Sequence, residues 1–267
     1  MLCPEKALEW DHRKLHLVEE LLRYEPTILC LQEVDRFQFL KDQLAQAGYT
    51  GIFFPKPDSP CLYSDINYGP DGCAVFWKSN TLSLSQKEDL VLQQDGGIET
   101  NQVAIVCTFQ TKQSPDSEQL CVAVTHLKSK PPYHQLRHEQ GKYLEQRLTK
   151  FVPDQCPLIV CGDFNAEPHE PVVETFRSSS LSLSSAYCHL SSDMTEPAYT
   201  TWKVRGHYKG NFESKQCIDY IWYTPRHLQP AALLKLPSED EIGKDRLPSL
   251  QYPSDHLSLV ADFSWKL

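Results

Sequence analysis

Short apolar runs alternate along the chain with longer stretches in which apolar residues recur at helical spacing. Residues 10–24 carry Leu15, Val18, Leu21 and Leu22 on one helical face, which predicts an amphipathic helix that ends before Pro26. Apolar runs bounded by glycine, proline and polar residues predict buried strands. The expected strands are 28–34, 49–54, 73–78, 101–109, 119–127, 158–164, 216–223 and 256–265, and the further expected helices are 37–48, 131–151 and 169–180.

Many strands and few crossover helices favour a four-layer α/β sandwich, in which two mixed sheets pack face to face and helices flank them. A doubly wound parallel sheet is less favoured, because no G-x-G-x-x-G follows an expected strand and no P-loop is present. A chain of 267 residues suits one large domain. We find no composition shift that marks a boundary, so we expect residues 1–267 to form a single domain.

Polar residues cluster where several of the expected strands begin or end. The stretch LIVCGDFNAEP runs from a buried strand directly into oxygen-bearing side chains, although a turn alone needs one Asp or Asn. The same pattern recurs elsewhere, at Glu33, at His126 and Lys128, at Asp163 and Asn165, at Asp219, and at Asp255 and His256. A single case is ordinary turn chemistry, but five together predict a shared site.

Several carboxylates crowd together at low cost only when a cation joins them. Oxygen ligands without clustered cysteines suit Mg²⁺, with Mn²⁺ as a second possibility, and Glu33 is the natural candidate for a ligand. Asp219 could fix the tautomer of His256, Asp163 could orient or deprotonate a water, and Asn165 could bond a phosphoryl oxygen. These roles predict metal-assisted hydrolysis of a phosphate ester.

Composition narrows the class of protein. Hydrophobic residues make up 40% and charged residues 23%, which is ordinary for a soluble globular protein, and no apolar run reaches the roughly 18 residues of a membrane span. Most of the ten cysteines sit in apolar runs, which predicts reduced thiols in an intracellular protein. The net charge of −9 favours a small anionic substrate over RNA, whose binding usually needs a basic groove.

The motifs LQEV, THLK, GDFNAEP, IDYIWY and SDHLSL, in this order over residues 31–259, resemble the endonuclease/exonuclease/phosphatase superfamily, whose fold resembles deoxyribonuclease I. The resemblance implies that Glu33 is the metal ligand and that Asp255 lies near the metal. It also implies that Asp163 and Asn165 activate the nucleophile and contact phosphate, while Asp219 supports His256 and His126 contacts the scissile phosphate. The basic residues that match substrate-binding positions are Lys56, Lys128 and Arg137.

Further stretches, including FFPKPDSPC, YGPDGCAVFW and THLKSK, resemble one branch of that family. This branch is implied to remove the 2′-phosphate of NADP⁺ and NADPH with Mg²⁺, in circadian and metabolic regulation. The branch was first grouped with poly(A)-shortening 3′ exoribonucleases, and the motifs do not separate the two activities. A truncated form that acts only by binding is a third alternative. The implied location is the cytoplasm, or the mitochondrion if a targeting segment precedes Met1; the oligomeric state is open.

One departure from the family pattern concerns the first strand. The family fold begins with a buried strand that ends in an asparagine, and this Asn helps to bind metal and phosphate. Here Met1 is followed at once by LCPEKALEW, which aligns with the segment after that strand. We therefore expect the first strand and its Asn to be missing, as in a short isoform, an incomplete gene model or a trimmed chain.

A version of the chain extended upstream by such a strand is expected to be more stable and more active. The strand would pair backbone groups that are otherwise left open, and its Asn would add a group to the site. Phosphate release from NADP⁺ with Mg²⁺ and the melting temperature, measured for both versions, check this expectation. Equal rates and equal melting temperatures would contradict it.

Overall fold

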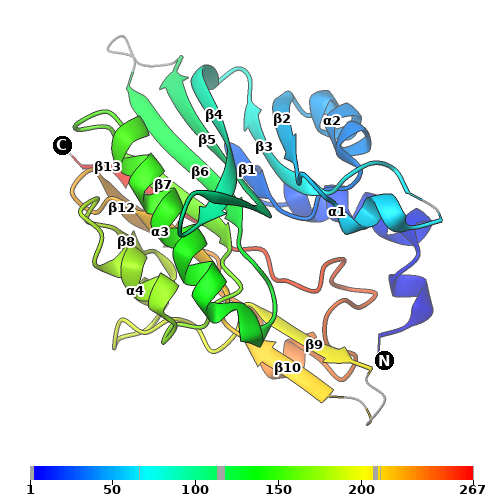
Figure 1. The fold of residues 1–267 in the computed structure, drawn as a ribbon. Helices are drawn as coiled ribbons and strands as arrows, with labels where there is room; N and C mark the ends of the chain where they lie inside the picture. The colour runs from blue at the N-terminus through cyan, green and yellow to red at the C-terminus, as the bar shows by residue number, and fades with distance from the viewer. Residues whose placement is uncertain (1–2, 66, 113–117, 207–209, 211, 267) are drawn as a thin grey trace.

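The computed structural model describes residues 3–65, 67–112, 118–206, 210 and 212–266, and its strands form two facing layers (Figure 1). The larger layer is a six-stranded sheet in the order β4-β5-β6-β7-β11-β8. Its strands are β4 (Leu82–Gln94), β5 (Ile98–Thr111), β6 (Gln119–His126), β7 (Leu158–Asp163), β11 (Asp219–Tyr223) and β8 (Ser184–Ser185). The sheet is antiparallel except for the parallel pair β6–β7, which requires a crossover connection.

Helix α3 (His134–Phe151) makes that crossover and lies on the outer face of the six-stranded sheet, beside α4 (Pro171–Arg177) (Figure 1). Leu144 and Leu148 of α3 are fully buried in one apolar cluster with Phe176 of α4 and with Trp222 of β11. Gly141 makes close packing of the two helices possible, because a Cβ there would lie 2.3 Å from a methyl group of Val172. Helix α3 is therefore packed tightly against the six-stranded sheet, whose strands β6, β7 and β11 end or begin in polar residues.

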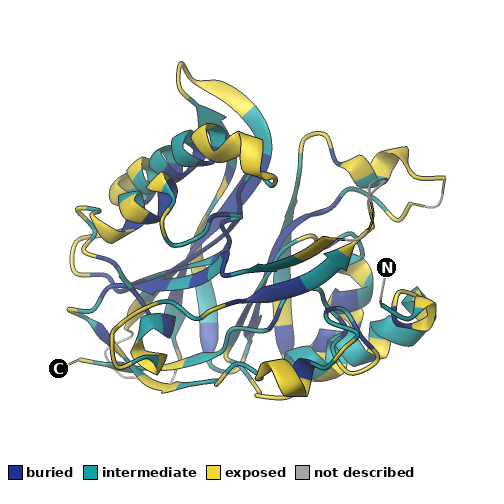
Figure 2. Cartoon of the chain, turned by 90° about the horizontal axis from the view of Figure 1, so that it is seen from below, coloured by how far each residue is buried: buried dark blue, intermediate teal, exposed yellow. Residues whose placement is uncertain are grey.

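The second layer contains a three-stranded sheet in the order β1-β3-β2 and a separate two-stranded sheet. The strands are β1 (Ile28–Leu31), β3 (Gly72–Lys78), β2 (Tyr49–Pro55), β12 (Leu228–Leu233) and β13 (Ala261–Trp265). Val75 and Trp77 of β3 pack against Ile105 and Phe109 of β5, so the two layers share an apolar core. The buried strands occupy the middle of the molecule in Figure 2, and the more exposed helices lie outside.

Two helices, α1 (Trp10–Leu22) and α2 (Phe37–Gln46), cover the outer face of the three-stranded sheet. Leu40 and Leu44 of α2 pack with Phe76 of β3 in a third apolar cluster. The expected mixed α/β architecture, with packed sheets flanked by helices, is confirmed. No helix within the described ranges is long and apolar enough to cross a membrane.

The structure differs from the expected elements in several places, and strands β8 and β12 are among the elements that were not expected. The long strand β4 was not expected, because its middle, QKED, is polar; only alternate positions such as Leu90 and Leu92 are buried. The hairpin of β9 (Thr201–Arg205) and β10 (Phe212–Gln216) was also missed. The last strand begins at Ala261 instead of residue 256, since Leu257 donates its backbone N–H to the carbonyl of Thr200 and not to a neighbouring strand.

Strand β1 lies at an edge of its sheet, and within the described part of the chain no strand precedes it. A cavity of about 1530 Å³ runs between β1 and residues 257–261. Its floor includes Val122 of β6 and Ile159 and Cys161 of β7, which face the gap. The cavity continues to the polar ends of β7 and β11, so the gap beside β1 and the candidate site are one connected space.

Replacing Gly141 by alanine is expected to destabilise the protein, although alanine is the better helix former. The clash with Val172 outweighs the gain in helix propensity, and we expect a net loss of roughly 1–3 kcal/mol in the free energy of unfolding, measured with urea. The matched control is Gln146→Ala, at an exposed position of the same helix, which should change the free energy by less than about 0.5 kcal/mol. A G141A variant as stable as the wild type would contradict this account of the α3–α4 contact.

Candidate active site

Three neighbouring strands of the six-stranded sheet bring polar residues to the same level. His126 closes β6 and pairs in register with Asp163, which closes the parallel strand β7. Asp163 also pairs with Asp219, the first residue of the antiparallel strand β11. Because directly paired residues point to the same face of a sheet, the three side chains lie side by side.

Gly162 allows β6 and β7 to approach each other directly before Asp163. Its φ is +146°, and a Cβ at this position would lie 2.0 Å from the carbonyl oxygen of Thr125. Any other residue would therefore both strain the backbone and push the strands apart. The glycine of the GDFN motif thus has a structural role, which is to hold Asp163 close to His126.

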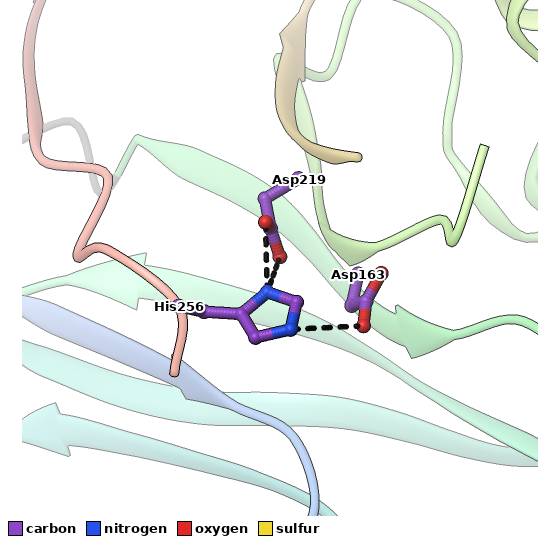
Figure 3. A group of neighbouring side chains, drawn as sticks. All are labelled: Asp163, Asp219 and His256. Carbon is purple, nitrogen blue, oxygen red and sulfur yellow. Dashed lines mark hydrogen bonds and ion pairs between the residues drawn. The ribbon is translucent and has the colours of Figure 1, made fainter. Parts of the chain in front are cut away.

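His256 joins the cluster from the segment near the C-terminus (Figure 3). Its Nδ1 lies 2.9 Å from Oδ2 of Asp219, and its Nε2 lies 3.9 Å from Oδ2 of Asp163. The same Asp163 oxygen is 3.5 Å from Nε2 of His126. The structure therefore brings together four of the residues expected from the sequence, with Asp163 between two imidazoles.

Thr200 and Thr201, which the sequence analysis missed, hold this arrangement in place. The Thr200 hydroxyl donates to Oδ2 of Asp219 at 2.5 Å, and the Thr201 hydroxyl donates to the carbonyl of Asp255 at 2.6 Å. Thr201 also forms an isolated β-bridge with His256. Both threonines are fully buried. A buried Thr-Thr pair has no distinctive sequence signal, because most such pairs only fill space in a core.

Burial and charge set the protonation of the cluster. Burial alone would lower the pKa of His256, but the carboxylates of Asp219, Asp163 and Asp255 outweigh it and raise this pKa to about 10. Burial, together with the charge of Asp219, raises the pKa of Asp163 above its ordinary value. Burial lowers the pKa of His126, which is therefore neutral near pH 7. The site combines an imidazolium, a neutral imidazole and a carboxylate with increased basicity.

Asn165 ties the end of β7 to the loop after β6. Its backbone N–H donates to Oδ1 of Asp163 at 2.7 Å, and its side-chain amide donates to the carbonyl of Leu127 at 3.0 Å. Its φ of +50° lies in the left-handed region, which asparagine tolerates better than most residues. An amide group has two N–H donors, so one donor remains for another acceptor.

Asp255 is paired with a cation that the sequence analysis did not single out. Nζ of Lys203 lies 2.5 Å from Oδ2 of Asp255 and 3.2 Å from Nε2 of His256. Burial by itself would raise the pKa of Asp255, but the charges of His256 and Lys203 lower it. With its charge offset by Lys203, Asp255 is placed to orient the His256 segment. Asp255 is not part of the Asp163–Asp219–His256 group, so the geometry does not favour it as a metal ligand.

Glu33 and Lys56 line the same cavity. Glu33 is exposed and has a φ of +53°, which directs the chain sharply after β1. Lys56 lies 2.5 Å from Oδ2 of Asp71, whose other oxygen accepts from Ser59 at 2.5 Å. Asp71 was not expected from the sequence, and it offsets the charge of Lys56 while both side chains remain largely buried.

Arg137 and Lys128 are not among the residues that line this cavity. Arg137 is 2% exposed; its guanidinium donates to Glu170 and to the carbonyls of Lys128 and Lys130. The ammonium of Lys128 lies 4.9 Å from the ring centre of Tyr133. The structure thus places Arg137 as a clamp on the loop after β6, with its donors engaged inside the protein.

The donor set suits a hard divalent cation. One oxygen of Asp163, one oxygen of Asp219 and a ring nitrogen of His256 all lie within 4.8 Å of one another. The carboxylate oxygens suit such a cation, whereas His256 as an imidazolium has two N–H donors and no lone pair to offer. Burial and, after it, repulsion from Asp219 raise the pKa of Asp163, and a cation would relieve the repulsion. Nδ1 of His126 is buried without a hydrogen-bond partner among the described residues, so this nitrogen can still form a hydrogen bond at the site.

The ion pair between His256 and Asp219 makes stability depend on pH. A folded-state pKa of about 10 lies above the ordinary value of 6.5, so His256 contributes stability that is fully present below pH 6.5 and is lost as pH rises through 10. The free energy of unfolding of the wild type relative to His256→Gln is therefore expected to decrease over this window. Urea unfolding with chelator present measures it.

The control for that measurement is His134→Gln, which replaces an exposed histidine at the start of α3. This variant should follow the wild type across the whole pH range. A constant difference between the wild type and His256→Gln from pH 6.5 to pH 10 would contradict the ion pair as the source of the raised pKa.

Comparison with known proteins agrees with this geometry. A model of the endonuclease/exonuclease/phosphatase family matches residues 2–256. Human nocturnin is 49% identical over 98% of this chain, which spans 60% of the length of that relative. A Ccr4 exoribonuclease subunit of the CCR4-Not complex from Neurospora crassa is 24% identical over 97% of this chain and is matched over 42% of its own length.

Among solved structures, the human nocturnin catalytic domain with a bound sulfate anion superposes with a TM-score of 0.85 and 45% identity. The match covers 97% of this chain and 88% of that structure. The family model spans almost all of the chain, including the strands that carry His126, Asp163 and Asp219. The chain therefore belongs to the endonuclease/exonuclease/phosphatase family.

Proposed function

We propose that this chain is a metal-dependent phosphatase that removes the 2′-phosphate of NADP⁺ and NADPH, giving NAD⁺ and NADH. The observation that carries the proposal is the cluster of Asp163, Asp219 and His256, which line one cavity, with His126 directly beside Asp163. Two carboxylates that alternate with two imidazoles can handle a water and a phosphate group at the same time. The near relatives named nocturnin support a place in this branch of the family.

Glu33, which lines the cavity, is the residue that would hold Mg²⁺, because carboxylate oxygens are its preferred protein ligands; Mn²⁺ fits the same donor. A divalent cation bound there polarises phosphoryl oxygens and offsets the negative charge that develops during hydrolysis. Asp255 was expected near the metal, and its pairing with Lys203 favours a supporting role through His256.

Proton transfer follows from the protonation states in the cluster. Asp163, whose pKa is raised by burial and by Asp219, is the best placed acceptor for a proton from the attacking water. His256 is held as an imidazolium by Asp219, so its Nε2–H can donate to a phosphoryl oxygen. His126 is neutral and buried beside Asp163, where it can orient the same phosphate without adding charge.

Binding of the substrate phosphate is assigned to Lys56 and Asn165. Lys56 lines the cavity and offers ammonium donors there, although Asp71 offsets its charge. Asn165 does not line the cavity, but it lies next to the Asp163 cluster and has a second amide N–H beside the one that bonds Leu127. The sulfate on the human relative is a tetrahedral oxyanion like phosphate, which supports an anion site in this fold. Lys128 could reach a substrate only from outside the cavity, and Arg137 would act indirectly, by holding the loop that carries Lys128.

A second candidate is a 3′ exoribonuclease acting on poly(A), which the Ccr4-type relative supports. Both activities need the same hydrolytic cluster, so the site alone does not rank them. The net charge of −9 favours the dinucleotide, because proteins that follow single-stranded RNA use positively charged grooves lined by stacking aromatic rings. A third candidate is a form that acts only by binding; it would not need the cluster to be intact.

The test compares phosphate release from NADP⁺ with adenylate release from poly(A), each with Mg²⁺ and with chelator. We expect phosphate release from NADP⁺ that requires the metal and is restored by Mn²⁺. Asp163→Asn should lower the rate by about 10²–10⁴-fold, because it removes the proton acceptor but keeps the shape of the side chain. The matched control is Asp154→Asn, an exposed residue in the turn before β7.

Three outcomes would contradict the proposal. Shortening of poly(A) without phosphate release from NADP⁺ would make the exoribonuclease the better assignment. Equal rates for Asp163→Asn and the wild type would remove the proposed role of Asp163. No release from either substrate, with a normally folded protein, would favour the form that acts only by binding.

A further inference from the structure

Cys121 and Cys156 form a pair of free thiols at the end of β6 and β7 that lies opposite the candidate active site. Cys121 lies near the start of β6, and Cys156 lies in the turn just before β7. Their sulfur atoms are 3.4 Å apart, and the backbone N–H of Cys121 donates to the carbonyl of Pro157 at 2.8 Å. The two backbones therefore already run side by side where the thiols meet.

We propose that Cys121 and Cys156 are an oxidative modification site, at which a hydroperoxide converts the two thiols into a disulfide. A disulfide has a sulfur–sulfur distance of about 2.05 Å, so the thiols must approach by a little over one ångström. Rotation of two short side chains supplies such a shift without moving the strands, which are fixed in register from Cys121–Leu158 to His126–Asp163.

Access distinguishes the two sulfurs. Cys156 lines a surface hollow of about 420 Å³, together with Pro153, His227 and Lys266, whereas Cys121 is fully buried behind it. A small peroxide can therefore reach Cys156 first. Cys121 is placed to attack next, because its sulfur already contacts the sulfur of Cys156. The hydroxyl of Thr108, 3.3 Å from the Cys121 sulfur, helps to hold that sulfur in place.

The ionisation of the pair supports the same order. A hydrogen bond from the Cys121 thiol lowers the pKa of Cys156, and it does so despite burial, which acts in the opposite direction. The pKa of Cys121 is raised by the same hydrogen bond and by burial. By contrast, burial raises the pKa of Cys73 and of Cys107 to about 12. Oxidation-sensitive cysteines combine thiolate character, access and a neighbouring resolving thiol.

The chemistry balances in two steps. The Cys156 thiolate attacks one peroxide oxygen, so that an S–O bond forms, the O–O bond breaks and hydroxide leaves, giving a sulfenic acid. The Cys121 sulfur then attacks the Cys156 sulfur; the S–S bond forms, the S–O bond breaks, and the leaving hydroxide takes the thiol proton as water. Two thiols and one hydrogen peroxide thus give one disulfide and two waters.

The disulfide would close the whole crossover β6–α3–β7 at its base. Crosslinking residues 121 and 156 restricts the unfolded chain more than the folded one, and the folded strands keep their register. We therefore expect the oxidised protein to melt about 5–10 °C above the reduced protein, with the change reversed by dithiothreitol. The disulfide would also help to keep the other end of β6 and β7 in register, where His126 pairs with Asp163.

The experiment treats the purified full chain with hydrogen peroxide, alkylates the remaining thiols and maps the peptides by mass spectrometry without reduction. The expected product joins the Cys121 and Cys156 peptides and has lost two hydrogens. Cys121→Ser should stop the reaction at a sulfenic acid on Cys156, which dimedone traps, and Cys156→Ser should leave Cys121 reduced. Circular dichroism establishes that each variant is folded, and Cys121→Ala replaces Cys121→Ser if that variant is not.

The matched control is Cys188→Ser, at a partly exposed cysteine outside the pair, which should leave the crosslink and the rise in melting temperature unchanged. Oxidation that leaves Cys121 and Cys156 open to alkylation, or that joins either of them to another cysteine, overturns the proposal. So does a crosslinked protein that melts no higher than the reduced one, because the closure of the crossover would then have no effect.

Discussion

The candidate site depends on one constraint, the register of three strands that places Asp163 between His126 and Asp219. Two carboxylates side by side in a buried position repel each other, and the protein offsets this repulsion with the imidazolium of His256. Thr200 and Thr201 fix the partners of that imidazolium, and Gly162 keeps β6 close to β7. The chemistry of the cluster is therefore a consequence of backbone geometry as much as of side-chain type.

Much of this site could be predicted from the sequence, because its residues stand at the ends of short apolar runs. A strand that ends in GD or TH carries both the burial signal and the polar group, so Asp163 and His126 were found together with their strands. His256 and Asp219 were paired correctly on the tendency of carboxylates to orient imidazoles. These predictions needed only local pattern and general chemistry.

The rest depends on contacts between distant segments, which local pattern does not carry. Arg137 looks like an available cation in the sequence, but in the fold Glu170 and two loop carbonyls engage its donors. Lys203 is one charged residue in a hairpin that was not expected, and only the tertiary structure sets it against Asp255. Strand β4 was missed because its polar middle, residues 86–89, interrupts the apolar run that signals a buried strand.

The engagement of Arg137 also determines how the site can move. Its guanidinium joins the loop after β6 to α3 and, through Glu170, to the segment before α4. Gln140 adds to this by accepting the backbone N–H of Lys128. Opening of this loop as an independent lid would have to break the buried hydrogen bonds of the Arg137 guanidinium, which are costly to lose. These bonds therefore couple the position of the loop that follows His126 to that of the crossover helix.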